Sequence, residues 1–365
     1  MFELSNARDI EDFIRGATLL GTGGGGDPKE GLKLLLDSLN QGNKLRVISL
    51  EELDEEDVVV SPYYVGTIAP TAKTRKPVKI SDPTKVAFKT MEEVLGKEVS
   101  AVIACEIGGL NTAIPFYIGS KMELPVIDGD LLGRSAPELH QCSCHIAGFP
   151  MYPSVMVSET GNLIVIRKYS DIDDYEALAR YVSVLAGRFV AVVDTPLTKS
   201  QLKKVIVPST ISLSLKVGRM IRESREKGSN PVEAAAEALN GWIVFEGVVR
   251  SFKWKDEGGF LIGEVEVKGS GRWSGRSLKS WIKNEHIFVW LDDDPIVMPP
   301  DIFALLKPDG EPVTNSELKE GMKVYGIAAK APEIWRTPKG LELFGPRHFG
   351  FNYDYIPVEE LVSRL

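Results

Sequence analysis

The chain has 365 residues, of which 43% are hydrophobic and 26% are charged, and its formal net charge is −8. The length allows a large core and two domains, and the composition is that of an ordinary globular protein. Because the sequence has no basic block and no apolar run of membrane-spanning length, neither nucleic acid nor a membrane is an expected partner. The N-terminus has no signal-peptide pattern, so we expect a cytoplasmic protein.

Cysteine and glutamine are both scarce. Three cysteines cannot all pair within one chain, so no disulfide framework is expected. Glutamine occurs only at positions 41, 141 and 201, whereas Lys and Glu are abundant. Thermophile proteins share this bias, and a thermophilic source is our working hypothesis.

A glycine-rich run at 21–28 (GTGGGGDP) separates two predicted helices. The apolar residues before it recur at helical spacing. After it, Asp27 suits an N-cap and Pro28 suits the first helical position, which predicts a helix over 28–40. The run therefore presents free N–H groups at a helix N-terminus, where an anionic group can bind. The residues expected to bind a ligand there are Gly23, Gly24, Gly25, Gly26 and Asp27.

Other interpretations of this run stay open. The pattern Gly21-x-Gly23-x-x-Gly26 matches the dinucleotide fingerprint of nucleotide-binding proteins, but that fingerprint follows a strand rather than a helix. No Lys-Ser/Thr follows the glycines, which argues against a P-loop. The glycines can also serve only to let two helices pack closely.

Short apolar strands alternate with helices in the first half of the chain. This alternation is typical of βαβ units. It predicts an α/β domain at residues 1–168 with a mainly parallel sheet that is covered on both faces. The predicted strands lie at 45–50, 58–60, 99–105 and 124–127, and further helices at 84–96 and 112–121.

Two of these strands run into loops with unusual chemistry, EIGGLNT at 106–112 and DGDLLGRSAPEL at 128–139. Ligands in open α/β sheets bind beyond the carboxyl ends of the strands. We therefore expect both loops and the glycine run to line one cavity, with ordinary turn chemistry as the alternative. Further ligand-binding candidates in the first loop are Gly108, Gly109 and Asn111.

The pair Asp128 and Asp130 has the clearest chemical logic. Residues two apart in an extended segment point the same way, so both carboxylates can face one pocket. Two close carboxylates can split their pKa values into one acid and one base, and an arginine four residues later can bind a substrate carboxylate. Alternatively, the two acids close a turn and cap a helix. The catalytic candidates are Asp128, Asp130, Glu106 and Arg134.

The segment HQCSCH at 140–145 concentrates imidazoles and thiols. Such residues can bind zinc, although their spacing departs from the usual zinc signatures. Inert filling of the core and a reactive thiol beside a histidine are the alternatives. The sequence does not identify a cofactor, and a divalent metal such as zinc is the candidate that this segment suggests. Its candidate ligands are His140, Cys142, Cys144 and His145.

The second half begins with helices and then changes character. Helical spacing appears at 174–188 and 210–227, and Ser229-Asn230-Pro231 suits the start of a third helix. From Trp242 onward, apolar and polar residues alternate between Gly and Asp turns, which predicts antiparallel β structure. Residues 169–365 are therefore expected to form an α+β domain that ends in an antiparallel sheet.

Within this second half, a polar cluster lies between Trp281 and Trp290. Ligands often bind at domain interfaces, and this cluster can reach the N-terminal site across one. A barrel rim or an oligomer contact is the alternative. The ligand-binding candidates here are Lys283, Asn284 and Glu285.

Taken together, these motifs resemble the S-methyl thiohydantoin desulfurase-like proteins, a family once called domain of unknown function 917. The resemblance covers nearly the whole chain in the same order. It implies an α/β N-terminal part and a C-terminal part that begins with helices and ends in β structure. The segments that carry it include GTGGGGDP (21–28), APT (69–71), EIGGLNT (106–112), DGDLLGRSAPEL (128–139), FEGVV (245–249) and GPRHFGFNYDYIPVEEL (345–361).

The resemblance implies a hydrolytic enzyme of thiohydantoin or hydantoin metabolism with a small-molecule substrate. In this interpretation Asp128 or Asp130 activates a water molecule that attacks the ring, and glycine-loop N–H groups hold the anion that develops. The alternative is a non-catalytic ligand-binding or accessory subunit of a hydantoinase or oxoprolinase system. We also expect a homo-oligomer.

Overall fold

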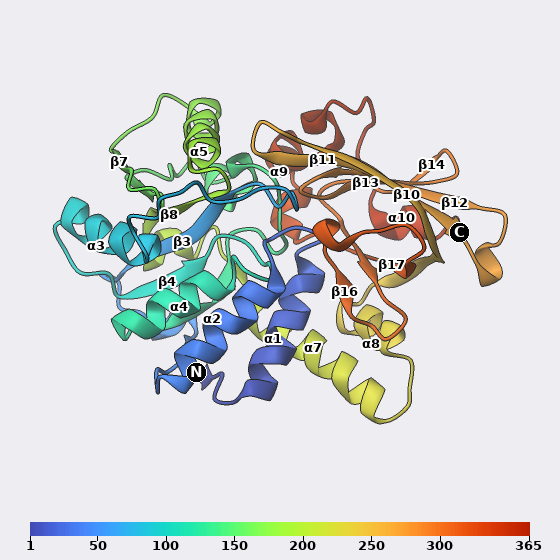
Figure 1. The fold of residues 1–365 in the computed structure, drawn as a ribbon, viewed down its shortest axis with the longest axis horizontal. Coiled ribbons are helices and arrows are strands. Elements are labelled where there is room, and N and C mark those ends of the chain that lie inside the picture. Colours follow the sequence, from blue (N-terminus) through green and yellow to red (C-terminus); the bar gives the residue numbers. More distant parts are fainter.

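A nine-stranded mixed sheet forms the centre of the N-terminal part of the computed structural model, which describes all 365 residues (Figure 1). The strands lie in the order β1-β2-β5-β4-β3-β8-β6-β7, and β9 pairs with β5. Their bounds are β1 Phe2–Glu3, β2 Arg46–Ile48, β3 Val58–Gly66, β4 Ala101–Ala104, β5 Val126–Asp130, β6 Ser154–Val157, β7 Leu163–Ile166, β8 Phe189–Thr198 and β9 Val207–Pro208.

Helices cover both faces of this sheet because successive strand residues are apolar on both sides. In β3, for example, Val58 and Val60 belong to one hydrophobic core and Val59 to the other. The first core includes residues of α1 (Ala7–Leu20), α2 (Pro28–Asn40), α3 (Pro83–Leu95) and α4 (Ala113–Met122), and of α7 (Thr210–Glu226). The second includes residues of α5 (Ile172–Ala186) and α6 (Lys199–Leu202).

The helix starts follow the local sequence signals. Asp27 accepts a hydrogen bond from the backbone N–H of Lys29 at 2.8 Å, and Pro28 occupies the first turn of α2. The helix α1 ends at Leu20, so a helix and not a strand leads into the glycine run. This arrangement removes the strand that a dinucleotide fingerprint requires.

The sheet is mixed rather than mainly parallel, and this corrects the sequence-based prediction. The pairs β2–β5, β4–β5 and β3–β4 are parallel, whereas β3–β8, β6–β8, β6–β7, β1–β2 and β5–β9 are antiparallel. The strand β8 enters the sheet between β3 and β6. The first sheet therefore includes two strands, β8 and β9, that lie after residue 168 in the sequence.

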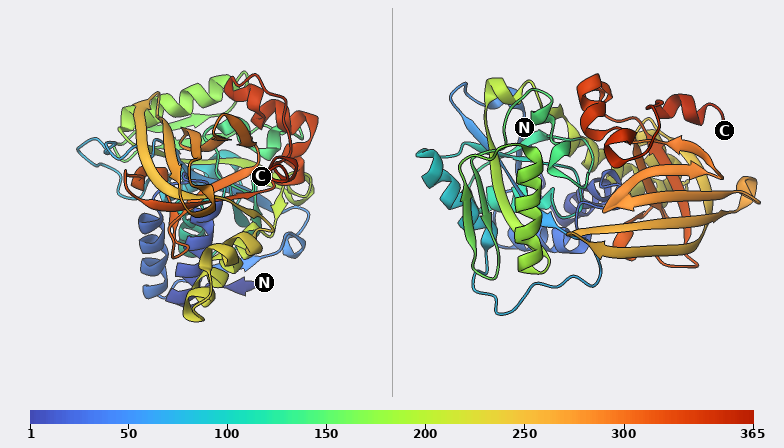
Figure 2. Two further views of the ribbon diagram at one scale, coloured as in Figure 1. Left: turned by 90° about the vertical axis from the view of Figure 1, so that its right-hand side faces the viewer. Right: turned by 90° about the horizontal axis from the view of Figure 1, so that it is seen from above.

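An eight-stranded antiparallel sheet forms the C-terminal part, as the alternation after Trp242 predicts, and Figure 2 shows it beside the α/β part. The strand order is β14-β13-β12-β11-β10-β17-β15-β16. None of the helices combines the length and hydrophobicity that a bilayer crossing requires. The bounds are β10 Trp242–Glu257, β11 Phe260–Gly269, β12 Ser277–Lys283, β13 Glu285–Leu291, β14 Asp294–Val297, β15 Ile302–Leu306, β16 Pro312–Val313, β17 Lys323–Ala329, α8 Pro231–Ala238, α9 Pro338–Phe344 and α10 Val358–Val362.

One buried guanidinium joins the two parts. Arg134, in the loop after β5, is fully buried. Its donors all go to neutral oxygen atoms, which belong to the glycine run, to its own loop and to the second sheet. These are Thr22 Oγ1 (2.9 Å) and the carbonyls of Ser135 (2.9 Å), His286 (2.9 Å), Pro300 (3.2 Å) and Asp301 (2.6 Å).

Replacing Arg134 by Met should destabilise the protein strongly, because several buried carbonyl groups lose their only charged donor. We expect a loss of about 1–3 kcal/mol in the free energy of unfolding, the range found when a buried polar group loses its hydrogen-bond partner. Urea denaturation measures it. A loss below about 1 kcal/mol would contradict the role of Arg134 as the tie between the two parts.

Candidate functional site

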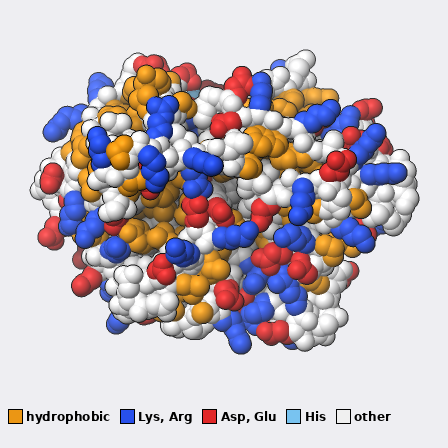
Figure 3. Space-filling view, viewed as in Figure 1, with side chains coloured by type: hydrophobic (Ala, Val, Ile, Leu, Met, Phe, Trp, Pro, Cys, Tyr) orange, Lys and Arg blue, Asp and Glu red, His pale blue; other side chains and the backbone are white.

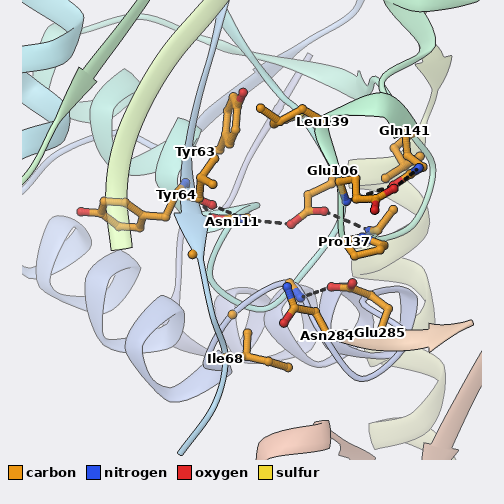
Figure 4. Close-up of a pocket in the computed structure, with 18 of the residues that line it drawn as sticks. Tyr63, Tyr64, Ile68, Glu106, Asn111, Pro137, Leu139, Gln141, Asn284 and Glu285 are labelled. Atoms are coloured by element: carbon orange, nitrogen blue, oxygen red, sulfur yellow. Dashed lines mark hydrogen bonds between the residues drawn. The ribbon is translucent and has the colours of Figure 1, made fainter. Parts of the chain in front are cut away.

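A pocket lies where the two parts meet, and its volume is about 650 Å³ including its open mouth. The α/β part supplies the glycine run, the end of β3 and the loops after β4 and β5, while the second sheet supplies Asn284 and Glu285. Figure 4 shows Glu106 and Glu285 entering it from these different elements. Its other polar and aromatic wall residues include Tyr63, Tyr64, Asn111, Glu138, Gln141, Arg180 and Phe189.

The glycines of the run are required because neighbouring chain segments come very close. A Cβ on Gly24 would lie 1.8 Å from Glu285 Oε1, and one on Gly25 would lie 2.4 Å from the Cα of Gly108. The carbonyl of Gly25 also accepts the N–H groups of Leu110 and Asn111. The run thus packs directly on the loop after β4, and its Gly24 and Gly25 approach the carboxyl group of Glu285.

The hydroxyl of Ser135 bridges two carboxyl groups. Its Oγ lies 2.8 Å from Glu106 Oε2 and 2.9 Å from Glu285 Oε1. A serine hydroxyl carries one hydrogen and can donate it to only one of them. The other contact becomes a hydrogen bond only if that carboxyl group itself holds a proton. The geometry therefore favours one shared proton between Glu106 and Glu285.

Unequal numbers of donors decide which carboxyl group keeps the proton. Glu106 also accepts from the side-chain amide of Asn111 at 2.7 Å and from the N–H of Ala136 at 3.1 Å. Glu285 has one backbone donor, Gly25 at 3.2 Å, and its Oε2 is buried with no partner in the protein. The ionised form of Glu106 is thus the better stabilised of the two, and Glu285 is the carboxyl group that keeps the proton.

The pKa values point the same way. Burial, followed by the charge of Glu106, raises the pKa of Glu285 to about 8. Burial also raises the pKa of Glu106, but the hydrogen bonds from Asn111 and Ser135 oppose the rise. A carboxyl pair of this kind can supply an acid and a base at neutral pH.

Asn111 holds Glu106 in place. Its side-chain oxygen accepts the backbone N–H of Tyr64 at 3.0 Å, and its amide nitrogen donates to the carbonyl of Tyr64 at 3.1 Å as well as to Glu106. The ring of Tyr64 stacks on Phe189 with 5.7 Å between ring centroids. This wall of the pocket is therefore aromatic, and Asn111 ties it to the backbone of β3 at Tyr64.

The structure places Asp128 and Asp130 outside the lining of this pocket. Asp128 accepts hydrogen bonds from the N–H (3.0 Å) and hydroxyl (2.5 Å) of Ser212 at the start of α7. Asp130 is fully buried and accepts from the N–H groups of Leu132 and Gly133, and burial raises its pKa to about 8. Asp128 and one oxygen of Asp130 thus bind neighbouring protein groups, the other oxygen of Asp130 is buried without a partner, and neither residue lines the pocket.

The predicted ligand-binding residues do not all line this pocket. Gly25, Gly26, Asn111, Asn284 and Glu285 line the pocket. Gly23, Gly24 and Asp27 line a neighbouring cavity together with Gly26. Gly108 and Gly109 lie behind the pocket, against Gly25 and Pro28, and Lys283 forms an ion pair with Glu138.

The four residues predicted as metal ligands do not bring their ligand atoms together in one group. His140 Nε2 lies 2.7 Å from Asp173 Oδ1, and His145 Nε2 lies 3.2 Å from the carbonyl of Leu139. Cys142 and Cys144 are buried in the second core of the α/β part. The only ligand atoms that gather in a group of three or more are those of Glu138, His140 and His348, which lie within 4.8 Å of one another.

Sequence reasoning assigned no role to Ser135, Glu138, Arg180 or the tyrosines of β3. Ser135 and Glu138 belong to the DGDLLGRSAPEL loop. The sequence therefore indicated that this loop contributes to the site, but not that these two residues do so. Arg180 comes from the middle of α5, and only tertiary structure shows that it reaches the carbonyl of Gly66 and the ring of Phe260.

The fold and this pocket define a two-domain protein in which an α/β part and an antiparallel β part enclose a carboxyl pair. The chain belongs to the S-Me-THD-like family: the N-terminal domain model of that family matches residues 8–168 and the C-terminal domain model matches residues 170–358. No curated protein matches the chain.

A crystal structure of a protein from Chromobacterium violaceum has a similar fold. Its TM-score is 0.78 at 22% sequence identity, and the match covers 98% of this chain and 100% of that chain. The likeness extends over both parts of the molecule and concerns the fold alone.

Replacing Glu285 by Gln should change how stability depends on pH. The folded protein keeps the Glu285 proton up to about pH 8, whereas the unfolded chain loses it near the ordinary pKa of 4.5. The contribution of this proton to the free energy of unfolding is therefore complete below pH 4.5 and is lost as the pH rises towards 8. The free energy of unfolding of the wild type should therefore fall between pH 5 and pH 8, relative to the variant, by an amount on the order of a few kcal/mol.

Urea denaturation of both proteins at pH 5, 6.5 and 8 measures this difference. Asp130, Asp194 and Asp301 are also buried acids with raised pKa values, and they are present in both proteins, so their effects cancel. Glu106 interacts with Glu285, so the difference between the two proteins reports the ionisation of this pair. Parallel pH profiles for the two proteins would show that Glu285 ionises normally.

Proposed function

We propose that this protein is a hydrolase that acts on a thiohydantoin-like or hydantoin-like ring, with Glu106 as general base and Glu285 as general acid. The observation that carries the proposal is the carboxyl pair joined by Ser135 at the wall of the interdomain pocket. Membership of the S-Me-THD-like family supports the substrate class.

For an S-methyl thiohydantoin the proposed reaction balances as follows. Glu106 takes a proton from water as the water oxygen adds to the ring carbon that bears sulfur, and Glu285 protonates the adjacent ring nitrogen. The carbon–sulfur bond then breaks, the new hydroxyl returns its proton to Glu285, and Glu106 protonates the departing methanethiolate. Water and the substrate thus give a hydantoin and methanethiol.

The pocket walls suit such a ring. Tyr63, Tyr64 and Phe189 offer aromatic surface to a flat heterocycle. The buried, unpartnered Oε2 of Glu285 is free to contact a ring nitrogen. We propose that the backbone of Gly26, which also lines the pocket, holds the oxygen or sulfur that becomes negative.

Glu106→Gln and Asp130→Asn form a matched pair of isosteric variants that tests the assignment of the base. We expect Glu106→Gln to lower kcat/KM by about 10²–10⁴-fold, the usual contribution of a general base. Asp130→Asn should keep kcat/KM within about tenfold of the wild type, because an amide oxygen can still accept the loop N–H groups. The assay follows methanethiol or sulfide release and ultraviolet absorbance with S-methyl thiohydantoins, thiohydantoins and hydantoins.

The reverse outcome, an inactive Asp130→Asn and an active Glu106→Gln, would return the role of base to the Asp128–Asp130 pair. Absence of turnover with all three compound classes, with and without divalent metals, would rule out the substrate class. A non-catalytic binding subunit would then be the better account, provided that calorimetry shows one of these compounds binding to the wild type.

We also propose that the chain forms a homo-oligomer through α5. Leu178, Tyr181, Val184 and Leu185 recur at helical spacing and are 47%, 65%, 45% and 37% exposed. Figure 3 shows hydrophobic side chains gathered over this region, at the upper left. An exposed apolar stripe of this kind is typical of an interaction surface.

Light scattering after gel filtration tests the oligomer. The wild type should have a mass that is a multiple of 40.1 kDa, and Tyr181→Asp should shift it towards the monomer mass, because a charge would then be buried in the contact. A wild-type monomer would refute the proposal, and so would an oligomer that Tyr181→Asp leaves intact.

A further inference from the structure

We propose that Glu138, His140 and His348 form a binding site for one zinc ion beside the pocket. Their ligand atoms lie within 4.8 Å of one another, and the two imidazole rings are 5.4 Å apart between centroids. The site is distinct from the Glu106–Glu285 pair, and the argument for it does not rest on the proposed reaction.

Two distant segments of the chain build this cluster. Glu138 and His140 flank the start of the short 3₁₀ turn Leu139–Gln141, and His348 lies in the turn Pro346–Phe349 that follows α9. His348 Nε2 lies 2.6 Å from Glu138 Oε2. The side chains of Glu138, His140 and His348 are 13%, 12% and 17% exposed, so solvent has limited access to the three groups.

The hydrogen bonding of His140 leaves one ring nitrogen ready for a metal. Its Nε2 lies 2.7 Å from the carboxylate of Asp173, whereas its Nδ1 is buried and has no partner in the protein. A carboxylate fixes the N–H on the ring nitrogen that it faces, so the lone pair is on the other nitrogen, Nδ1. Metal-binding histidines commonly have this carboxylate–histidine arrangement.

Glu138 supplies a negative oxygen to the same space. Lys283 pairs with Oε1, which leaves Oε2 on the side of the imidazole of His348. One carboxylate oxygen of Glu138 therefore faces the space between the three groups.

Two imidazoles and one carboxylate are a donor set typical of zinc sites that keep one position open. Glu138 and its neighbour Gln141 both line the pocket, so an ion at this cluster would lie next to any bound substrate. This set shares only His140 with the four ligands predicted from the HQCSCH segment. The difference between the two sets gives the experiment its control.

Zinc titration of the full-length, chelator-treated protein by calorimetry tests the site. We expect one Zn²⁺ per chain in the wild type and at least a 100-fold weaker affinity in His348→Gln and in Glu138→Gln. His145→Gln, a nearby histidine outside the cluster, should bind within threefold of the wild type. The visible absorption of bound Co²⁺ should disappear in the same two variants and persist in His145→Gln.

Circular dichroism establishes whether each variant is folded. If His348→Gln does not fold, Glu138→Gln, which keeps the size of the side chain, provides the test. A wild type that binds no stoichiometric zinc overturns the proposal. Zinc binding that survives both variants, or that is lost in His145→Gln, also overturns it. Because the titration measures occupancy and not turnover, it stands or falls separately from the proposed hydrolase activity.

Discussion

The buried guanidinium of Arg134 is the constraint on which the rest of the structure depends. It binds oxygen atoms of the glycine run, of its own loop and of the second sheet, and each of these segments contributes to the pocket wall. An arginine with neutral partners is costly to bury, since burial lowers its pKa to about 10. Its field also falls on Glu285 and opposes the rise in the pKa of that acid. One side chain thus couples the assembly of the pocket to its electrostatics.

The chemistry of the pocket follows from how tightly the chain converges there. Glycine at position 24 lets the glycine run approach Glu285, and glycine at position 25 lets the same run pack on the loop after β4. Glu285 is buried with few donors, while Asn111 and Ala136 leave Glu106 better supplied with donors. A single serine hydroxyl then links an acid and a base that are 179 positions apart in the numbering (285 − 106). The proposed reaction needs only this difference between the pKa values of Glu106 and Glu285, together with a flat aromatic wall.

Local signals predicted most of the helices, the first parallel strands and the antiparallel second sheet, but not the strands β6, β7 and β8. The cap at Asp27 and Pro28 gave the observed start of α2, and the alternation after Trp242 gave the antiparallel sheet. Pairings between distant segments were beyond reach: nothing in β8 indicates that it enters between β3 and β6. The spacing of Asp128 and Asp130 likewise cannot tell which side of the sheet holds the pocket. Glu106 and Asn111 were found because strand ends are informative, whereas their link to Glu285 through Ser135 is a tertiary contact.

The central claim is that Glu106 and Glu285 share one proton at neutral pH. Carbon-13 NMR of protein labelled at the glutamate carboxyl carbons tests it most directly. The account predicts one glutamate resonance that titrates near pH 8 and disappears in Glu285→Gln, with a second resonance that shifts in response to the same proton. If every glutamate carboxyl group titrates below about pH 6, the two groups are ordinary surface-like acids and the account is wrong.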